Sequence, residues 1–153
     1  MSTTLARDVM TPNVQYVHPF DNVSQIAKVM VKAGISAVPV CDNGHIVGII
    51  SEGDLMAPFT EKRKLQRDWW LSILAEGTTL AKDFLEYIDA YNLTAQDLMK
   101  KDVIVGRADM TLAQIAQLLQ EHHIKRVPIV ENGLMVGIVS RADLIRSYAH
   151  GHS

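Results

Sequence analysis

The chain contains a single cysteine, Cys41, among its 153 residues. One thiol cannot form an intramolecular disulfide, and it excludes zinc sites built from several cysteines. Long apolar runs are also missing, since no stretch reaches the roughly 18 residues that a membrane helix needs. The first eight residues, MSTTLARD, lack the basic and apolar parts of a signal peptide. We therefore expect a cytoplasmic protein that has no contact with a membrane.

An excess of charge of one sign is absent as well. The chain has 15 Lys and Arg against 17 Asp and Glu, so its net charge is −2. This balance argues against nucleic acid as a bulk electrostatic partner. No Walker loop, G-x-G-x-x-G, H-E-x-x-H or G-x-S-x-G motif occurs. We accordingly expect neither an enzyme nor a metal site.

The chain does contain an internal repeat. Residues 6–55 align with residues 95–144 without a gap at an offset of 89, and 18 of the 50 positions are identical. Repeats indicate that one structural unit occurs more than once. Length alone suggests one domain, whereas the repeat predicts two copies of one motif.

Each copy is predicted to fold as strand–helix–strand–strand–helix. In copy one, 14–17 reads as a short strand, and Asn22 is a good N-cap for a helix that ends at Gly34. The apolar face of this helix is predicted to consist of Val23, Ile26, Ala27, Met30 and Val31. Two strands, 37–41 and 46–50, flank an Asn-Gly hairpin signal, and Ser51-x-x-Asp54 resembles a capping box for a final helix.

Copy two repeats these signals. Thr111 is the helix cap, Asn132-Gly133 is the turn, and Ser140-x-x-Asp143 is the closing box. The predicted helix face is Leu112, Ile115, Ala116 and Leu119. One departure is His123, which stands where copy one has Gly34.

The fold class expected is α+β or α/β, with two small motifs that pack sheet against sheet about a pseudo-twofold axis. A motif of about 50 residues cannot cover its own sheet, so a ligand is expected in the clefts between the copies. The predicted organisation is 1–58 for motif one, 59–92 for a helical insert and 93–150 for motif two. Apolar spacing predicts two helices in the insert, one ending near Gly77 and one starting at Thr79.

Several segments of the repeat carry a resemblance to a known family. They are VGIISEGDL (47–55), VGIVSRADL (136–144), GISAVPV (34–40), IKRVPI (124–129) and DVMTP (8–12). Together they resemble the CBS-domain signature. The chain as a whole is similar to a stand-alone bacterial CBS pair, or Bateman module. The resemblance implies a homodimer that senses adenine nucleotides, namely AMP, ADP or ATP, or S-adenosylmethionine, with Mg²⁺ as an optional companion of the nucleotide and with no catalytic cofactor.

The resemblance also implies site residues. Asp54 and Asp143 match the position that binds ribose hydroxyls. Ser51 and Ser140 stand at predicted helix N-termini, where free N–H groups favour a phosphate. The residues implied to contact ligand are Tyr16, Ile35, Ser36, Val38, Ser51, Asp54, Ile124, Lys125, Arg126, Val127, Ser140, Arg141 and Asp143.

The two sites implied in this way differ in charge. Lys125 and Arg126 match the phosphate-facing basic pair, whereas the aligned residues of copy one, Ser36 and Ala37, are uncharged. Arg141 likewise stands opposite Glu52. The alignment therefore predicts that copy two supplies nearly all of the phosphate-facing charge and that the two clefts differ in affinity.

The function expected is regulatory nucleotide binding, read out by a conformational or dimer rearrangement and passed to a protein target. Two alternatives from other classes stay open. One is a structural interaction module whose clefts are vestigial. The other is a nucleic-acid-binding module that uses the basic residues Lys62, Arg63, Lys64 and Arg67 of the insert.

Overall fold

The computed structural model describes residues 3–58 and 92–151. They divide into two compact units. One contains Met1–Gln15, Asp42–Ile46 and Asp102–Ser153, and we call it the β4–β5 unit after its main strands. The other contains Tyr16–Cys41 and Val47–Lys101, and we call it the β1–β2 unit. The predicted helical insert falls almost entirely outside the described residues.

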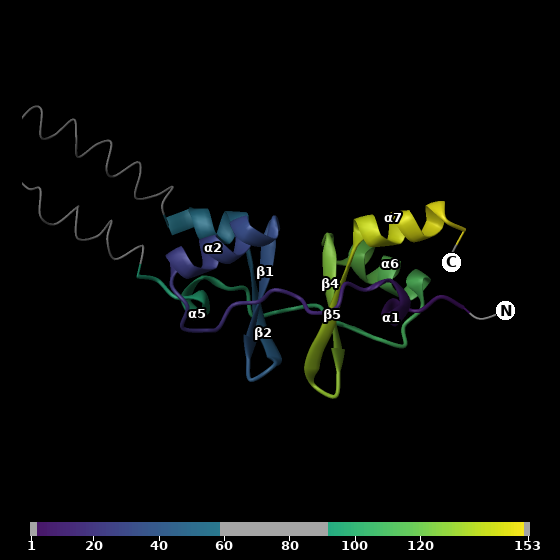
Figure 1. Cartoon of the computed structure of the whole chain (residues 1–153), viewed down its shortest axis with the longest axis horizontal. Helices are drawn as coiled ribbons and strands as arrows, with labels where there is room; N and C mark the ends of the chain where they lie inside the picture. The colour runs from purple at the N-terminus through teal and green to yellow at the C-terminus, as the bar shows by residue number, and fades with distance from the viewer. Residues whose placement is uncertain (1–2, 59–91, 152–153) are drawn as a thin grey trace, which may run out of the picture. The chain divides into compact units, whose positions relative to one another are not determined.

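The β4–β5 unit has a three-stranded sheet in the order β3-β4-β5. Strand β3 (Gly106–Arg107) runs parallel to β4 (Arg126–Glu131), and β4 pairs antiparallel with β5 (Leu134–Ser140). Three helices accompany the sheet: α1 (Ala6–Val9), α6 (Leu112–Glu121) and α7 (Arg141–Ala149). The helices lie to one side of the β4–β5 hairpin (Figure 1).

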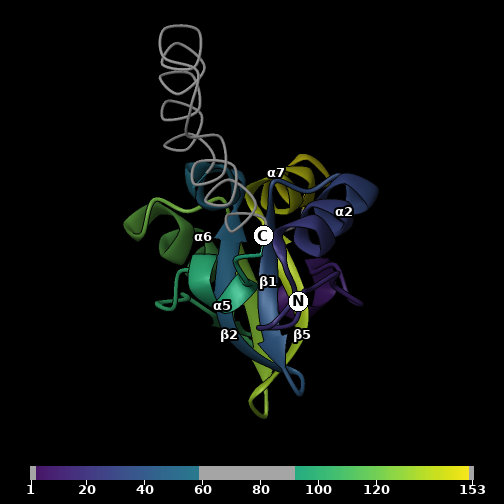
Figure 2. The ribbon, with the colours of Figure 1, turned by 90° about the vertical axis from the view of Figure 1, so that its left-hand side faces the viewer.

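The β1–β2 unit repeats this arrangement. Strands β1 (Ala37–Asp42) and β2 (His45–Ser51) form a hydrogen-bonded hairpin, seen from two directions in Figures 1 and 2. Helices α2 (Val23–Ala33) and α5 (Ala95–Leu98) accompany it, and a further helix begins at residue 52 and is described to residue 58. The strand predicted at 14–17 is wrong in extent, because only Val17 pairs, in a parallel bridge to Val40. That bridge is the counterpart of Gly106 beside Ile129 in β3–β4.

The predicted helix caps are confirmed. Asn22 accepts a hydrogen bond from the Gln25 N–H at 3.0 Å, and Thr111 accepts one from the Gln114 N–H at 3.2 Å. Gly34 ends α2 in the left-handed conformation at φ +66°. His123 adopts the same conformation at φ +52°, so copy two keeps this backbone turn without a glycine.

The predicted helix faces are confirmed with one exception. Val23, Ile26 and Met30 of α2 are buried, and so are Leu112, Ile115 and Leu119 of α6. The two alanines of the predicted faces, Ala27 and Ala116, are half-buried. Val31 is the exception, since 82% of its surface is exposed. Val29 instead packs against the core of the β1–β2 unit.

Both hairpin turns follow their Asn-Gly signals. Asn43 and Gly44 have φ values of +51° and +84°, and Asn132 and Gly133 have +55° and +80°. Positive φ at both central residues is the requirement of a type I′ turn, which suits the twist of the flanking strands.

Each sequence repeat starts with a short head segment, residues 6–11 in copy one and 95–100 in copy two, which begins with a short helix. Each head segment packs in the unit that contains the hairpin of the other repeat. Helix α1 begins copy one, yet Ala6 belongs to the core that copy two builds around Leu112 and Ile129. Helix α5 begins copy two, yet Ala95 belongs to the core that copy one builds around Ile26 and Val38. The backbone follows the same exchange. Thr11 bridges to Ile138 and Lys100 bridges to Ile49, each pair being antiparallel.

A methionine and a glycine fit together at each exchange. A Cβ atom added to Gly137 would overlap the side chain of Met10, and one added to Gly48 would overlap Met99. Both overlaps include the Cγ atom of the methionine, which would lie 2.8 Å from the added Cβ at Gly137 and 2.7 Å at Gly48, so they are not confined to its flexible end. The glycine of the Val-Gly-Ile segment therefore provides room for the head segment of the other repeat.

Cys41 is the free cysteine of the described chain and is 1% exposed. Burial raises the pKa of its thiol to about 11 because the thiolate would lose its solvation. The thiol therefore stays protonated at neutral pH, as expected for a small buried hydrophobe.

None of the described helices is long and apolar enough to span a bilayer.

The glycine contacts generate the first prediction. Gly48→Ala and Gly137→Ala should each lower the free energy of unfolding by roughly 1–3 kcal/mol, because the added methyl group overpacks a filled site. Urea denaturation of the full chain measures this change. Gly53→Ala is the matched control, since its Cβ would meet only the Ser51 Oγ at 3.7 Å and should not destabilise the protein. Wild-type stability of Gly137→Ala would contradict the role assigned to the glycine.

Candidate functional site

In the β4–β5 unit the predicted site residues gather where β5 passes into α7. Arg126 begins β4 and pairs with Ser140, the last residue of β5. The next N–H, that of Arg141, donates a 2.9 Å hydrogen bond to the Lys125 carbonyl. The ladder and this bond together bring Lys125, Arg126, Ser140 and Arg141 to the first turn of α7.

Asp143 completes this group as a capping carboxylate. Its Oδ2 accepts the Ser140 N–H at 2.8 Å, and its own N–H donates to the Ser140 Oγ at 3.1 Å. Its Oδ1 is paired with the guanidinium of Arg146, and only 9% of the side chain is exposed. A carboxylate offers about four lone-pair positions. These two partners therefore leave Asp143 with capacity to accept further donors.

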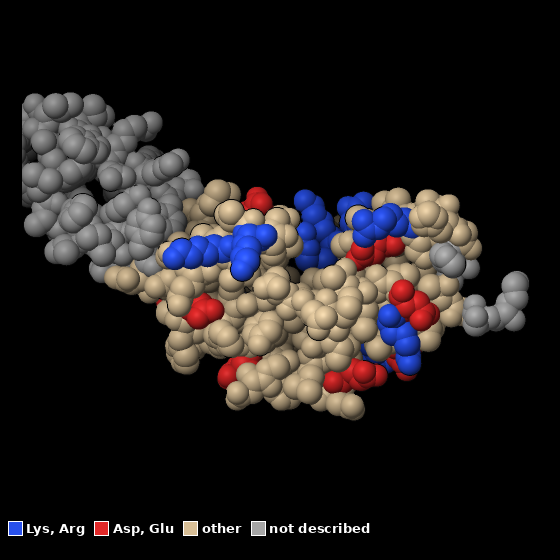
Figure 3. Space-filling model, viewed as in Figure 1, with Lys and Arg blue, Asp and Glu red and all other residues tan. Residues whose placement is uncertain are grey.

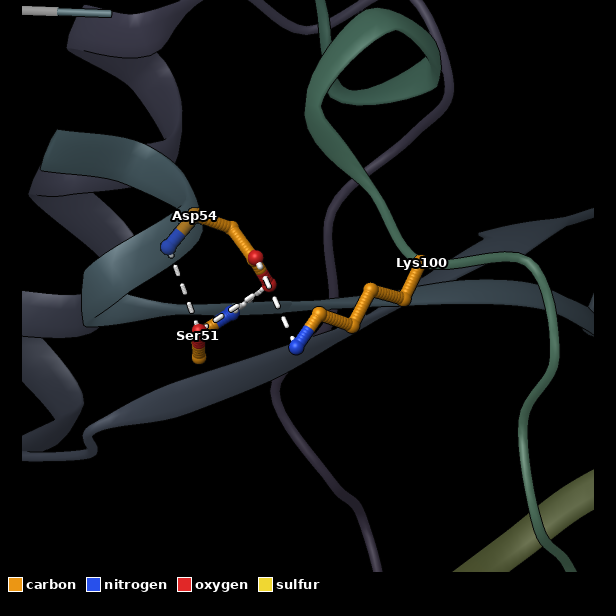
Figure 4. Close-up of polar contacts among 3 residues, drawn as sticks. All are labelled: Ser51, Asp54 and Lys100. Atoms are coloured by element: carbon orange, nitrogen blue, oxygen red, sulfur yellow. Dashed lines mark hydrogen bonds and ion pairs between the residues drawn. The ribbon is translucent and has the colours of Figure 1, made fainter. Parts of the chain in front are cut away.

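The β1–β2 unit builds the corresponding site in the same way. The Glu52 N–H donates to the Ser36 carbonyl at 2.9 Å, which repeats the bond from Arg141 to Lys125. The Asp54 Oδ2 accepts two hydrogen bonds from Ser51, one from its N–H and one from its hydroxyl, each 2.9 Å long (Figure 4). The Ser51 hydroxyl thus donates to Asp54 in this structure.

Lys100 lies beside the same carboxylate. Its Nζ is 3.9 Å from the Asp54 Oδ1, the oxygen that Ser51 leaves open (Figure 4). Lys100 comes from the head segment of copy two, and its backbone is held by two hydrogen bonds to Ile49 of 2.9 and 3.0 Å. The copy-one site therefore has a cation near its carboxylate, and this cation, like Lys125 and Arg126, comes from copy two.

The five apolar or aromatic residues among those implied to contact ligand differ in burial. Tyr16 is 43% exposed and lies edge-on to the His18 ring, with 5.4 Å between the ring centroids. Ile35 and Ile124 are partly buried, each against the core of its own unit. Val38 and Val127 are 0% exposed. The last two side chains are core residues, so only their backbone could meet a ligand.

The described residues around the two carboxylates differ in charge. Asp143 has four basic residues near it in sequence or through strand pairing, namely Lys125, Arg126, Arg141 and Arg146. Asp54 has one basic neighbour, Lys100, and one acidic neighbour, Glu52. Figure 3 shows the cations gathered around the start of α7 with an acidic group among them. The β4–β5 site is thus the more positive of the two.

Sequence reasoning missed two residues. Arg146 follows Asp143 by three positions, and this helical spacing was a usable signal for an ion pair. Lys100 could not be found in that way, because only the exchange of head segments brings it to Asp54.

The model of the CBS domain family matches residues 6–59 and 95–150. The chain belongs to the CBS domain family. The two matches place a tandem pair of CBS motifs in one chain, so the fold class expected from the repeat is confirmed.

Three known proteins illustrate the similarity. The uncharacterized protein MJ1426 of Methanocaldococcus jannaschii is 32% identical over 152 residues, covering 94% of this chain and 90% of its own. The chloroplastic CBS domain-containing protein CBSX2 of Arabidopsis thaliana is 30% identical over 146 residues, covering 92% of this chain and 61% of its own. A crystal structure of CBSX2 in complex with AMP matches with a TM-score of 0.71 and 28% identity, covering 95% of this chain and 96% of that chain.

The capping geometry generates a second prediction. Ser140→Ala should lower the free energy of unfolding by about 1 kcal/mol, because the Asp143 N–H loses its side-chain acceptor. Chemical denaturation measures the loss, and Ser140→Thr, which keeps an acceptor oxygen, is the matched control. Equal stability of Ser140→Ala and the wild type would contradict a capping role for the hydroxyl.

Proposed function

We propose that this CBS pair is a regulatory protein that binds an adenine nucleotide at its Ser-x-x-Asp sites. The observation that carries the proposal is the duplicated capping carboxylate, which lies at a helix start beside basic side chains. The relative solved with AMP, at 28% identity over nearly the whole chain, supports adenine nucleotides as the ligand class.

The chemistry of the site suits this ligand. Asp54 and Asp143 keep lone pairs that can accept the two ribose hydroxyls. Arg126 and Arg141 supply guanidinium groups, which form forked hydrogen bonds with phosphate. The start of α7 adds the positive end of its helix dipole for the same phosphate. Tyr16, Ile35 and Ile124 offer partly exposed apolar surface for a base.

Regulation follows when the ligand prefers one conformation of the protein. A ligand shifts such an equilibrium only by its differential affinity for the two states. We propose that a nucleotide acts on the chain in this way, through a conformational or dimer rearrangement that a protein target reads. No catalytic step is part of the proposal, and the insert is a proposed surface for the target.

The first test of the function is thermal. AMP, ADP or ATP should raise the melting temperature of the full chain, because a ligand at 100 times its dissociation constant stabilises the folded state by about 2.7 kcal/mol. Differential scanning fluorimetry with each nucleotide and with S-adenosylmethionine measures the shift. Arg126→Ala and Asp143→Ala should reduce it, whereas the exposed Lys101→Ala is the matched control and should not.

The contradicting outcome is equally plain. If none of these four ligands changes the melting temperature, the nucleotide proposal fails. Capture of a protein target that depends on residues 59–92 would then favour the structural interaction module.

A homodimer is part of the proposal and has its own prediction. Val31 on α2 and Ile145 on α7 are 82% and 63% exposed, and Tyr148 is 47% exposed. Burying such apolar side chains would stabilise an association. Sedimentation equilibrium of the full chain should give about twice the mass of 17.0 kDa, and Ile145→Asp should weaken the dimer. A monomer at all micromolar concentrations would contradict the dimer.

A further inference from the structure

Lys100 is the residue from which a further property of the β1–β2 site can be derived. Two backbone hydrogen bonds join Lys100 to Ile49 and fix the main chain of Lys100. Ile49 lies two residues before Ser51 in the sequence. The side chain of Lys100 reaches the Asp54 Oδ1, with 3.9 Å between the two charged atoms (Figure 4). The main chain of Lys100 is therefore fixed, and its ammonium group lies beside Oδ1, the Asp54 oxygen that accepts no hydrogen bond from Ser51.

The two partners of this ion pair differ in freedom. The Asp54 Oδ2 is held by two hydrogen bonds from Ser51, and the carboxylate side chain is 16% exposed. The Lys100 side chain is 72% exposed, and the 3.9 Å separation leaves no direct hydrogen bond to Oδ1. An exposed pair of this kind is weak. Lys100 can therefore leave Asp54 while the carboxylate stays in place.

We propose that Lys100 makes the β1–β2 site selective for adenine ligands that carry a phosphate. This inference rests on the proposed function. In the free protein the ammonium group neutralises the Asp54 Oδ1. When ribose hydroxyls take the carboxylate, the ammonium group turns to the phosphate near the helix start at Ser51. A nucleoside without phosphate displaces the lysine and offers it no anion in return.

The selectivity is confined to one site because the exchanged residues differ. Thr11 takes the backbone position in the β4–β5 unit that Lys100 takes in the β1–β2 unit, since it pairs with Ile138 as Lys100 pairs with Ile49. Threonine has no charge. At that site the cations are Lys125, Arg126, Arg141 and Arg146, and none of them comes from the head segment of copy one. Phosphate recognition there does not need a residue from the head segment.

The test uses the full chain with Asp143→Ala, which removes the ribose carboxylate of the β4–β5 site. Isothermal titration with AMP and with adenosine gives the ratio of their affinities at the β1–β2 site. Lys100→Met keeps the length of the side chain and removes its charge, and Lys101→Met is the matched control on the neighbouring exposed lysine. Circular dichroism melting of each variant checks that it is folded.

We expect AMP to bind about tenfold more tightly than adenosine, which corresponds to about 1.4 kcal/mol for one charge-assisted contact. In Lys100→Met the ratio should fall to about one, with weaker AMP binding and unchanged or tighter adenosine binding. Lys101→Met should keep the ratio. If Lys100→Met binds AMP with the same preference as its parent, the lysine proposal is overturned and the proposed function stands. If the wild-type chain binds neither compound, the proposed function is overturned as well.

Discussion

The exchange of head segments is the constraint on which the rest of the structure depends. Each short head segment forms an antiparallel bridge with a strand of the other repeat, Thr11 with Ile138 and Lys100 with Ile49. Met10 and Met99 occupy the space that Gly137 and Gly48 leave open. Neither repeat completes its own core, because Ala6 and Ala95 are contributed across the repeat boundary. One cation of the candidate sites, Lys100, also crosses that boundary to lie beside Asp54.

Local signals in the sequence predicted most of the fold. The cap at Asn22 and the two Asn-Gly turns depend on contacts within a few residues, and the structure confirms them. The strand predicted at 37–41 is confirmed as part of β1. The strand predicted at 14–17 was wrong in extent, because its partner strand lies further along the chain and pairs with Val17 alone among these residues. The burial predicted for Val31 was wrong, because helical spacing gives the direction in which a side chain points but not whether a neighbour covers it.

The candidate site was predictable in the same uneven way. The boxes Ser51-x-x-Asp54 and Ser140-x-x-Asp143 were readable because their hydrogen bonds span three residues. Lys100 was not readable, since its contact with Asp54 depends on a tertiary exchange that leaves no local pattern. The ligand roles of the thirteen residues implied by the family resemblance stay predictions. The hypothesis that Lys62, Arg63, Lys64 and Arg67 bind nucleic acid lies outside the described residues.

The central claim is that the two capping carboxylates bind an adenine nucleotide. Equilibrium dialysis of the full chain against AMP tests it most directly, with Asp54→Ala/Asp143→Ala as the paired variant. The account predicts saturable retention of AMP by the wild-type chain and loss of that retention in the folded double variant. Equal AMP on both sides of the membrane, or undiminished retention by the double variant, would contradict it.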